Sequence, residues 1–213
     1  ISHQTKSPIA NLLLYTQLLS VRESDPVAEE SLTAIQKQAE KLNFLIGSLI
    51  KMSRLETGII TLHPQEQDIR EMLSETIASY REKAERKGLE LKDLSEPVRV
   101  CFDRKWTAEA IGNILDNAVK YTDRGSITVR TKQYELFTAV EVEDTGRGLG
   151  EEEIPFVFQR FRRGEETQDQ DGVGIGLYLA REILAGEGGY IRISSEKGIV
   201  SVFSVFLPNK TPL

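Results

Sequence analysis

Residues 113–121 read Asn-Ile-Leu-Asp-Asn-Ala-Val-Lys-Tyr, and this stretch indicates the fold of the larger part of the chain. Its apolar residues recur at the spacing of an amphipathic helix, which we predict over Arg104–Tyr121. Asn113 and Asn117 are four residues apart, so their side chains share one face of that helix. Neutral amide oxygens can ligate Mg²⁺ there, and Lys120 can reach a polyphosphate held at the same place. Two asparagines are otherwise poor choices for a helix interior.

A second motif follows a predicted strand at Thr138–Glu143 and reads Asp-Thr-Gly-Arg-Gly over residues 144–148. The carboxylate of Asp144, at the end of a strand, can accept a hydrogen bond from an adenine amino group. Gly146 and Gly148 would let a flat ring approach the backbone closely. Taken alone, the motif is equally compatible with an ordinary acidic turn.

A third motif, Gly-Val-Gly-Ile-Gly-Leu over residues 172–177, opens a helix predicted over Ile175–Gly186. Backbone N–H groups at the start of a helix form an anion site. The motif is not the dinucleotide-binding fingerprint, because Leu177 stands where the third glycine would be. The chain also lacks the phosphate-loop pattern that ends in Gly-Lys-Ser/Thr. The polar run 162–171 before it predicts a mobile loop that can close over a nucleotide.

The rest of residues 67–213 mixes helix and strand patterns without strict alternation. This order predicts an α/β sandwich in which helices cover one face of a mixed sheet. The other predicted elements are a helix at Ile69–Lys87 and strands at Val98–Phe102, Ser126–Thr131, Tyr190–Ser195 and Ile199–Leu207. Trp106 and Cys101 are expected in or near the core.

Residues 1–57 predict a helical hairpin, so the chain as a whole is of the α+β class. One helix is expected at 9–19 and a second from Leu32, where apolar residues repeat at heptad spacing. Two helices cannot bury both seams alone, and a dimeric four-helix bundle would complete them. A monomeric hairpin packed on the second domain is the alternative. Residues 58–66 read as a linker, with Ile59–Leu62 strand-like and His63 an ordinary linker residue.

Composition excludes several classes of protein. The 213 residues carry a net charge of −6, which disfavours binding to nucleic acid. The single cysteine cannot form an internal disulfide or a cysteine-based zinc cluster. No apolar run approaches the roughly 18 residues that span a bilayer, so direct membrane contact is not expected. The first residues read as the middle of a helix, which suggests a fragment of a longer chain.

The order of the motifs is more specific than any one of them. Asn-x-x-x-Asn, Asp-x-Gly-x-Gly, Phe158-Gln-Arg-Phe161 and Gly-x-Gly-x-Gly, in this sequence, resemble the ATP-binding domain of sensor histidine kinases. The same fold occurs in gyrase, Hsp90 and MutL. The resemblance implies ATP and Mg²⁺ as ligands, with the metal at Asn113 and Asn117 and Arg160 near the terminal phosphate. It places the nucleotide at Asn113, Asn117, Lys120, Tyr121, Asp144, Gly146, Gly148, Phe158, Phe161, Gly172, Gly174, Gly176 and Leu177.

The N-terminal segment extends the resemblance to almost the whole chain. Residues 3–8 read His-Gln-Thr-Lys-Ser-Pro and are similar to the phosphoacceptor box of these kinases. A neutral imidazole is nucleophilic near pH 7. The resemblance therefore makes His3 the phosphoacceptor. Gln4 replaces the usual acid and can fix the ring tautomer but is a poor base. Ser7 stands where Thr or Asn orients water for dephosphorylation of the partner, and its hydroxyl can serve that role.

The resemblance implies a homodimeric kinase core that phosphorylates His3 from ATP and passes the phosphoryl group to a response-regulator receiver domain. It would be the cytoplasmic portion of a membrane-anchored sensor, with a hinge predicted at Arg54–Leu62. Two alternatives stay open at this point. One is an ATPase of the gyrase and Hsp90 kind, which the asparagine at 113 opposes because those enzymes carry a glutamate there. The other is a non-catalytic ATP-binding dimeric scaffold.

Overall fold

The computed structural model describes residues 12–17, 19, 26–161 and 174–210. They divide into two compact units, the first ending at Ile60 and the second beginning at Thr61. His3, Gln4, Ser7, Gly172 and the predicted loop 162–171 lie outside the described residues.

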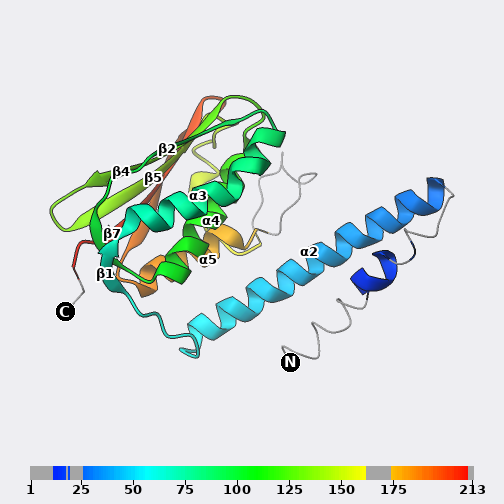
Figure 1. Ribbon diagram of the computed structural model, residues 1–213, viewed down its shortest axis with the longest axis horizontal. Coiled ribbons are helices and arrows are strands. Elements are labelled where there is room, and N and C mark those ends of the chain that lie inside the picture. Colours follow the sequence, from blue (N-terminus) through cyan, green and yellow to red (C-terminus); the bar gives the residue numbers. More distant parts are fainter. Residues whose placement is uncertain (1–11, 18, 20–25, 162–173, 211–213) are drawn as a thin grey trace. The chain divides into compact units, whose positions relative to one another are not determined.

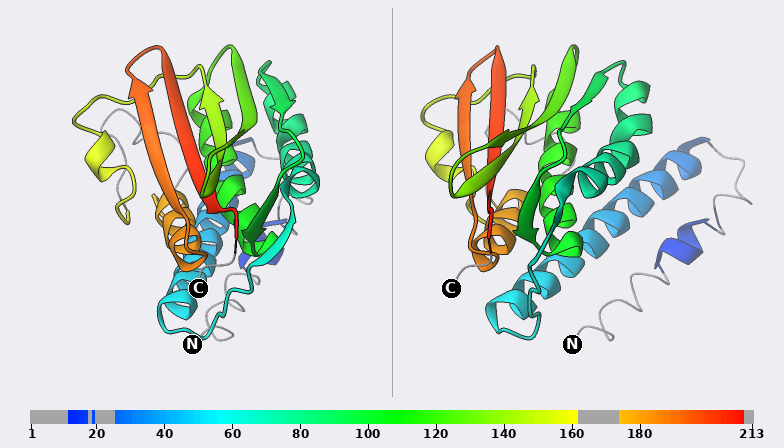
Figure 2. Two further views of the ribbon diagram at one scale, coloured as in Figure 1. Left: turned by 90° about the vertical axis from the view of Figure 1, so that its left-hand side faces the viewer. Right: turned by 60° about the vertical axis from the view of Figure 1, so that its left-hand side comes forward.

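A mixed five-stranded sheet forms one layer of the second unit, in the order β2-β4-β5-β7-β6. Strand β2 runs parallel to β4, and the remaining neighbours are antiparallel. The sheet stands in front of the helices in the left view of Figure 2. The strands are β2 (Glu90–Leu94), β4 (Ser126–Gln133), β5 (Phe137–Asp144), β6 (Tyr190–Glu196) and β7 (Val200–Pro208).

Three helices of this unit lie on one face of the sheet, as Figures 1 and 2 show. They are α3 (Ile69–Arg86), α4 (Arg104–Tyr121) and α5 (Gly176–Gly186). Alternate residues of β5 and β7 point toward the helices and are buried, as the period of two in a strand requires. This layer contains Ile77, Ile111, Leu115, Val140, Val142, Ile183, Phe203, Val205 and Leu207. The predicted α/β sandwich with a mixed sheet is confirmed, and Trp106 and Cys101 are buried as expected.

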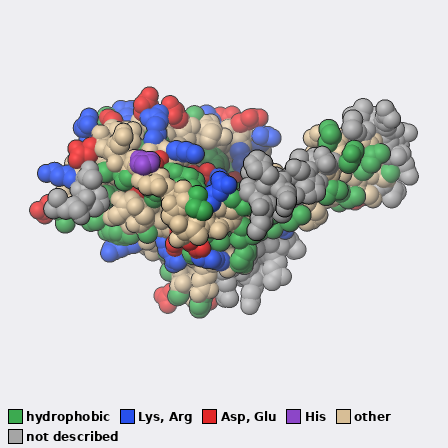
Figure 3. Space-filling view, turned by 90° about the horizontal axis from the view of Figure 1, so that it is seen from below, with side chains coloured by type: hydrophobic (Ala, Val, Ile, Leu, Met, Phe, Trp, Pro, Cys, Tyr) green, Lys and Arg blue, Asp and Glu red, His purple; other side chains and the backbone are tan. Residues whose placement is uncertain are grey.

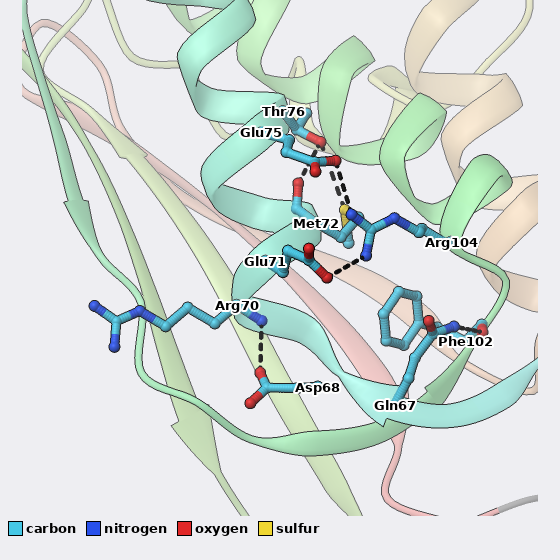
Figure 4. Close-up of polar contacts among 9 residues, drawn as sticks. All are labelled: Gln67, Asp68, Arg70, Glu71, Met72, Glu75, Thr76, Phe102 and Arg104. Carbon is cyan, nitrogen blue, oxygen red and sulfur yellow. Dashed lines mark hydrogen bonds and ion pairs between the residues drawn. The ribbon is translucent and has the colours of Figure 1, made fainter.

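The junction between α3 and α4 is fixed by local caps and by charge (Figure 4). Asp68 precedes α3 and accepts a hydrogen bond from the backbone N–H of Arg70, which satisfies one free donor of the first turn. Arg104 opens α4 and pairs with Glu71 and Glu75 of α3 at 3.0 and 2.8 Å. Because these ion pairs are exposed, they add little to the stability of the fold, and their main effect is to hold the start of α4 beside α3.

Two strands of the second unit were not predicted. Strand β1 (Gln65–Asp68) pairs antiparallel with β3 (Arg99–Phe102), and β2 lies at the edge of the main sheet. Their sequences, Gln-Glu-Gln-Asp and Glu-Leu-Lys-Asp-Leu, are mostly polar, so hydrophobic alternation does not reveal them. The predicted domain limits of 1–57, 58–66 and 67–213 stay predictions, although β1 begins inside the expected linker.

The prediction of a strand-like segment at Ile59–Leu62 was wrong. The chain turns there instead, with Gly58 at φ +69° and the N–H of Ile60 donating to the carbonyl of Arg54 at 2.9 Å. Ile59 is 71% exposed. Because β-branched residues favour strands only when a sheet is available to pack against, local propensity was a poor guide here.

The first unit contains the long helix α2 (Pro26–Glu56) and a helical segment at residues 12–17. Large hydrophobic side chains lie exposed on both and at residue 19, and this unit shows green areas in Figure 3. They are Leu12, Leu14, Tyr15, Leu19, Ile35, Leu42, Phe44 and Leu49. None of the described helices is both long and apolar enough to cross a membrane.

Candidate nucleotide site

Helix α4 and the start of α5 meet at Asn113. The side-chain N–H of Asn113 donates to the carbonyl of Glu109 at 3.0 Å, one turn earlier in the same helix. Its other atom, Oδ1, then faces the first residue of α5, where a Cβ built on Gly176 would lie only 2.9 Å from it. The first and last predicted motifs therefore come together, with an amide oxygen beside the N-terminus of a helix.

Asp144 ends strand β5 and is buried, with 4% of its surface exposed. Its Oδ1 accepts hydrogen bonds from the backbone N–H of Gly146 at 3.0 Å and from the hydroxyl of Thr122 at 3.5 Å. Burial raises the pKa of Asp144 to about 6, the two hydrogen bonds oppose that rise, and the nearby Glu143 adds to it. This aspartate is the kind of perturbed acid found at functional sites.

The glycines after Asp144 have no room for a side chain. A Cβ on Gly146 would lie 2.5 Å from the carbonyl oxygen of Tyr121 and 2.7 Å from Oδ1 of Asp144. Gly148 has φ +62°, and a Cβ there would lie 2.1 Å from the carbonyl oxygen of Glu196. The segment is thus packed by its bare backbone against the end of α4 and the β6–β7 turn. The expected approach of a flat ring to these glycines stays a prediction.

Lys120 and Tyr121 end α4 and contact one another. The ammonium of Lys120 donates to the Tyr121 hydroxyl at 3.0 Å and lies 4.6 Å from the centre of its ring. The guanidinium of Arg147 lies 5.7 Å from the same ring and pairs with Glu153 at 3.0 Å. Two cations therefore converge on the half-buried Tyr121, beside the motif that contains Asp144.

The Phe158–Phe161 motif reaches the last glycine motif through the backbone. It follows a short 3₁₀ helix, η1 (Ile154–Phe156), and the N–H of Phe161 donates to the carbonyl of Gly174 at 2.9 Å. Phe161 has φ +61° and is 56% exposed, whereas Phe158 is half-buried. A bulky residue held in the left-handed region is a strained arrangement of the kind that gathers at ligand sites.

Arg160 is directed at helix α5. Its guanidinium donates to the hydroxyl of Tyr178 at 2.5 Å and lies 4.4 Å from the centre of that ring. Tyr178 is buried and is two residues beyond Gly176, the first residue of α5. Leu177, between them, is half-buried. Arg160 is therefore anchored to the residue that directly follows the glycine motif, and its contact with a terminal phosphate stays a prediction.

Residues 102–211 match the family model described as histidine kinase-, DNA gyrase B- and HSP90-like ATPase, and residues 1–58 match the His Kinase A phospho-acceptor domain. The first match alone covers more than half of the chain, and the two domains occur in the order that the sequence predicts. The chain belongs to the sensor histidine kinases. Its second unit is an ATP-binding domain of that family.

Sensor protein SrrB of Staphylococcus aureus is a curated relative of this histidine kinase core. The MRSA252 protein is 29% identical over 220 residues and the N315 protein 28% identical over the same length. Each alignment covers 98% of this chain but 37% of the relative. The chain thus spans little more than a third of the length of these sensor proteins.

Solved structures of histidine kinases share the fold. Full-length ShkA in complex with AMPPNP superposes with a TM-score of 0.81 at 21% identity, over 99% of this chain and 45% of ShkA. The histidine kinase AdeS of Acinetobacter baumannii superposes with a TM-score of 0.71 at 20% identity, over 99% of both chains. The α+β fold class of the kinase core is confirmed.

Sequence reasoning missed the residues that hold the predicted ones in place. Glu109 orients Asn113 through a backbone carbonyl, Thr122 donates to Asp144, and Tyr178 anchors Arg160. Thr122 directly follows the Lys-Tyr pair, so its place at the end of a predicted helix was a usable signal. Nothing in the sequence pattern points to Glu109 or Tyr178, because each acts through a contact set by folding.

Proposed function

We propose that this kinase core transfers the terminal phosphoryl group of ATP to His3 and then to an aspartate on a response-regulator receiver domain. The observation that supports this most is the meeting of Asn113 with the N-terminus of α5. This meeting places a neutral amide oxygen beside a helix N-terminus, which is an anion site. Residues 1–58 of the same chain match a phospho-acceptor domain.

The described residues can divide the recognition of ATP between base and phosphates. Both hydrogen bonds that Asp144 makes to described residues go to Oδ1, which leaves Oδ2 for the amino group of adenine. Gly146 and Gly148 hold the backbone after Asp144 close to α4 and the β6–β7 turn, and the base would lie beside this segment. Tyr121, Phe158 and Phe161 would lie at the edges of the site. Lys120, Gly174 and the start of α5 would bind the phosphates, together with Gly172 of the same sequence motif, and Arg160 would lie near the last phosphate.

A magnesium ion fits the site as a companion of the phosphates. No group of three or more His, Cys, Asp or Glu in the described part of the chain is arranged to hold a metal by itself. Asn113 can supply Oδ1, since its Nδ2 is engaged with the carbonyl of Glu109. Asn117 follows four residues later in α4, on the same face of the helix. When bound, the ion would neutralise charge on the phosphates during transfer.

The acceptor is better explained as a histidine than as water. Asn113 cannot take a proton near pH 7, so it cannot activate water as a glutamate would. A nitrogen of the neutral His3 ring would attack the terminal phosphorus, the bond to the bridging oxygen would break, and ADP would leave with that electron pair. The ring, which becomes cationic as the N–P bond forms, would then release its N–H proton to solvent. The gyrase-like ATPase and the non-catalytic scaffold are therefore not favoured.

Residues near His3 in the sequence would influence the rate of His3 phosphorylation and the dephosphorylation of the response regulator. Gln4 can fix the ring tautomer by a hydrogen bond. Ser7 follows His3 by four residues in the sequence, and its hydroxyl would orient a water molecule for dephosphorylation of the response regulator. The exposed apolar side chains of the first unit support a homodimer, and the family supports the cytoplasmic portion of a membrane-anchored sensor.

Phosphorylation with γ-labelled ATP and Mg²⁺ tests the proposal directly. The unaltered protein should acquire label that is stable to alkali and lost in acid, as expected for phosphohistidine. His3→Ala should abolish the label. The matched control is His63→Ala, which removes the other histidine of the chain and should label normally. The labelled protein should then pass its phosphoryl group to a receiver domain.

Either of two results would contradict the proposal. Label that survives in His3→Ala would place the acceptor elsewhere. Steady release of phosphate without protein label would instead support an ATPase. Binding of ATP should persist in His3→Ala, because the nucleotide site lies in the second unit, and this separates loss of the acceptor from loss of the fold.

A further inference from the structure

Lys87 follows helix α3 and holds the far end of helix α4. Its ammonium donates hydrogen bonds to the carbonyl oxygens of Val119, Lys120 and Thr122 at 2.9, 3.0 and 2.9 Å. An ammonium has three N–H donors, so all of them are used on one short stretch of backbone. The carboxylate of Asp123 lies 3.9 Å away and adds a weak attraction.

Two of these carbonyls, those of Val119 and Lys120, lie in the last turn of α4, where the helix cannot satisfy them itself. The last turn of an α-helix leaves carbonyl oxygens without partners and carries partial negative charge. Lys87 supplies both the donors and the positive charge. Its side chain is 35% exposed, so these interactions are partly shielded from solvent.

The backbone that Lys87 holds is also a wall of the nucleotide site. The carbonyl of Tyr121 accepts from the N–H of Arg147 at 3.3 Å and lies against Gly146. Thr122 presents its hydroxyl to Asp144. The position of residues 119–122 therefore affects how the Thr122 hydroxyl, the Tyr121 ring and the ammonium of Lys120 stand relative to Asp144.

We infer that Lys87 is a positioning residue for nucleotide recognition, and this inference rests on the nucleotide site proposed above. It acts through the backbone of residues 119–122 and touches neither nucleotide nor phosphate. The consequence is specific. Loss of the ammonium should loosen Thr122 beside Asp144 and impair selection of the adenine amino group, beyond any loss of helix packing.

The chain contains a matched comparison. Lys83, one turn earlier on α3, pairs with Asp116 of α4. Like Lys87, it is a cation that connects α3 to α4. The side chains of Lys83 and Asp116 are 49% and 46% exposed. Its contact lies away from residues 119–122. Replacing either lysine by methionine removes one tie between α3 and α4, but only Lys87→Met releases the wall of the site.

Calorimetric binding to the folded kinase core tests the inference. The ligands are ATP and the triphosphate of purine riboside, whose base lacks the adenine amino group, both measured without Mg²⁺. Lys87→Met should weaken ATP binding about tenfold and shrink the preference for ATP over the purine analogue. Lys83→Met should leave both quantities within about twofold of the unaltered protein. Lys87→Gln keeps two N–H donors without the charge, so its ATP affinity and its preference for ATP should lie between those of Lys87→Met and the unaltered protein. It also provides a test if the methionine variant folds poorly.

Nucleotide-free thermal unfolding completes the design. A purely structural role of Lys87 predicts equal losses of Tm in the two methionine variants, with unchanged ATP affinity and unchanged preference for ATP. That result would overturn the inference about Lys87 but leave the proposed function standing. Failure of the unaltered chain to bind ATP would overturn the proposed function together with the inference. A reduced preference for ATP in Lys87→Met, at a temperature where the variant is folded, is the expected result.

Discussion

Asp144 shows how one residue combines burial with hydrogen bonds to described residues that all go to one of its two oxygens. Its Oδ1 accepts two hydrogen bonds, from Gly146 and Thr122, while burial raises its pKa to about 6. At pH 7 the group is mostly ionised, so it can accept from an amino group. Protonation would place an O–H donor opposite the adenine amino group that we propose Asp144 recognises.

ATP affinity should therefore fall as the pH is lowered through 6. A decrease of several-fold between pH 7.5 and about pH 5 is expected, since the ionised fraction of a group with this pKa falls about tenfold per unit below it. Calorimetry across this range, in constant ionic strength, measures it. Asp144→Asn should bind weakly at every pH and lose the dependence. A parallel slope in that variant would assign the titration to another group.

At the scale of elements, Glu187 joins the end of α5 to the start of α4. It is 1% exposed, and its carboxyl oxygens lie 2.9 and 2.8 Å from the hydroxyl of Thr107. One oxygen accepts from the backbone N–H of Asp103 at 3.0 Å. Burial raises the pKa of Glu187 to about 7, the hydrogen bonds from Thr107 and Asp103 oppose the rise, and the charge of Asp103 adds to it.

The raised pKa of Glu187 makes the second unit less stable at alkaline pH. The folded chain keeps this proton up to about pH 7, whereas the unfolded chain loses it near 4.5. The contribution of this protonation to the free energy of unfolding is thus full below pH 4.5. It is lost as the pH rises through 7, which lowers the free energy of unfolding by about 3 kcal/mol. Glu187→Gln keeps an oxygen that can accept from Thr107 and Asp103 but carries no charge. It should therefore raise Tm at pH 8 and change it little at pH 5.

The control for this element is Glu182→Gln, on the same helix, which removes an ion pair with Arg181. It should not reproduce the gain in Tm at pH 8. Differential scanning calorimetry of the three proteins at both pH values gives the comparison. An equal effect of Glu187→Gln at pH 5 and pH 8 would show that the carboxyl is not buried as a neutral group.

At the scale of the whole molecule, the first unit exposes hydrophobic side chains that one copy of the chain does not bury. Ile35, Leu42 and Leu49 belong to the heptad seam of α2 and are 48%, 45% and 36% exposed. Ala39, on the same seam, is buried at 6%. A second copy of the hairpin would cover these side chains in a four-helix bundle.

Leu42→Glu should convert the predicted dimer into a monomer. Two charges would enter the bundle core, and the dissociation constant should rise by about a hundredfold or more. Gln38→Glu is the matched control, because it adds the same charge at an exposed position off the seam. Light scattering during gel filtration measures the mass. ATP binding by the second unit should be unchanged in both variants, and a Leu42→Glu dimer of normal affinity would rule out this seam.

The elements that the sequence predicts well are those whose pattern is local. Helix α4 has the predicted limits, Arg104–Tyr121, because its apolar period and its capping Asp103 are both written in consecutive residues. The ordered motifs predicted the family for the same reason. Polar strands such as β2 escaped notice, since pairing with β4 rather than their own hydrophobicity makes them strands.

What the sequence determined by itself was therefore the chemistry: amides at 113 and 117, an acid at 144 and glycines where backbone must approach. Only the tertiary structure decided which groups stand together. It set Oδ1 of Asn113 against Gly176, Thr122 against Asp144 and the ammonium of Lys87 against the end of α4. The physical reason is that spacing along a helix or strand fixes neighbours within one element, whereas contacts between elements depend on how the buried faces pack.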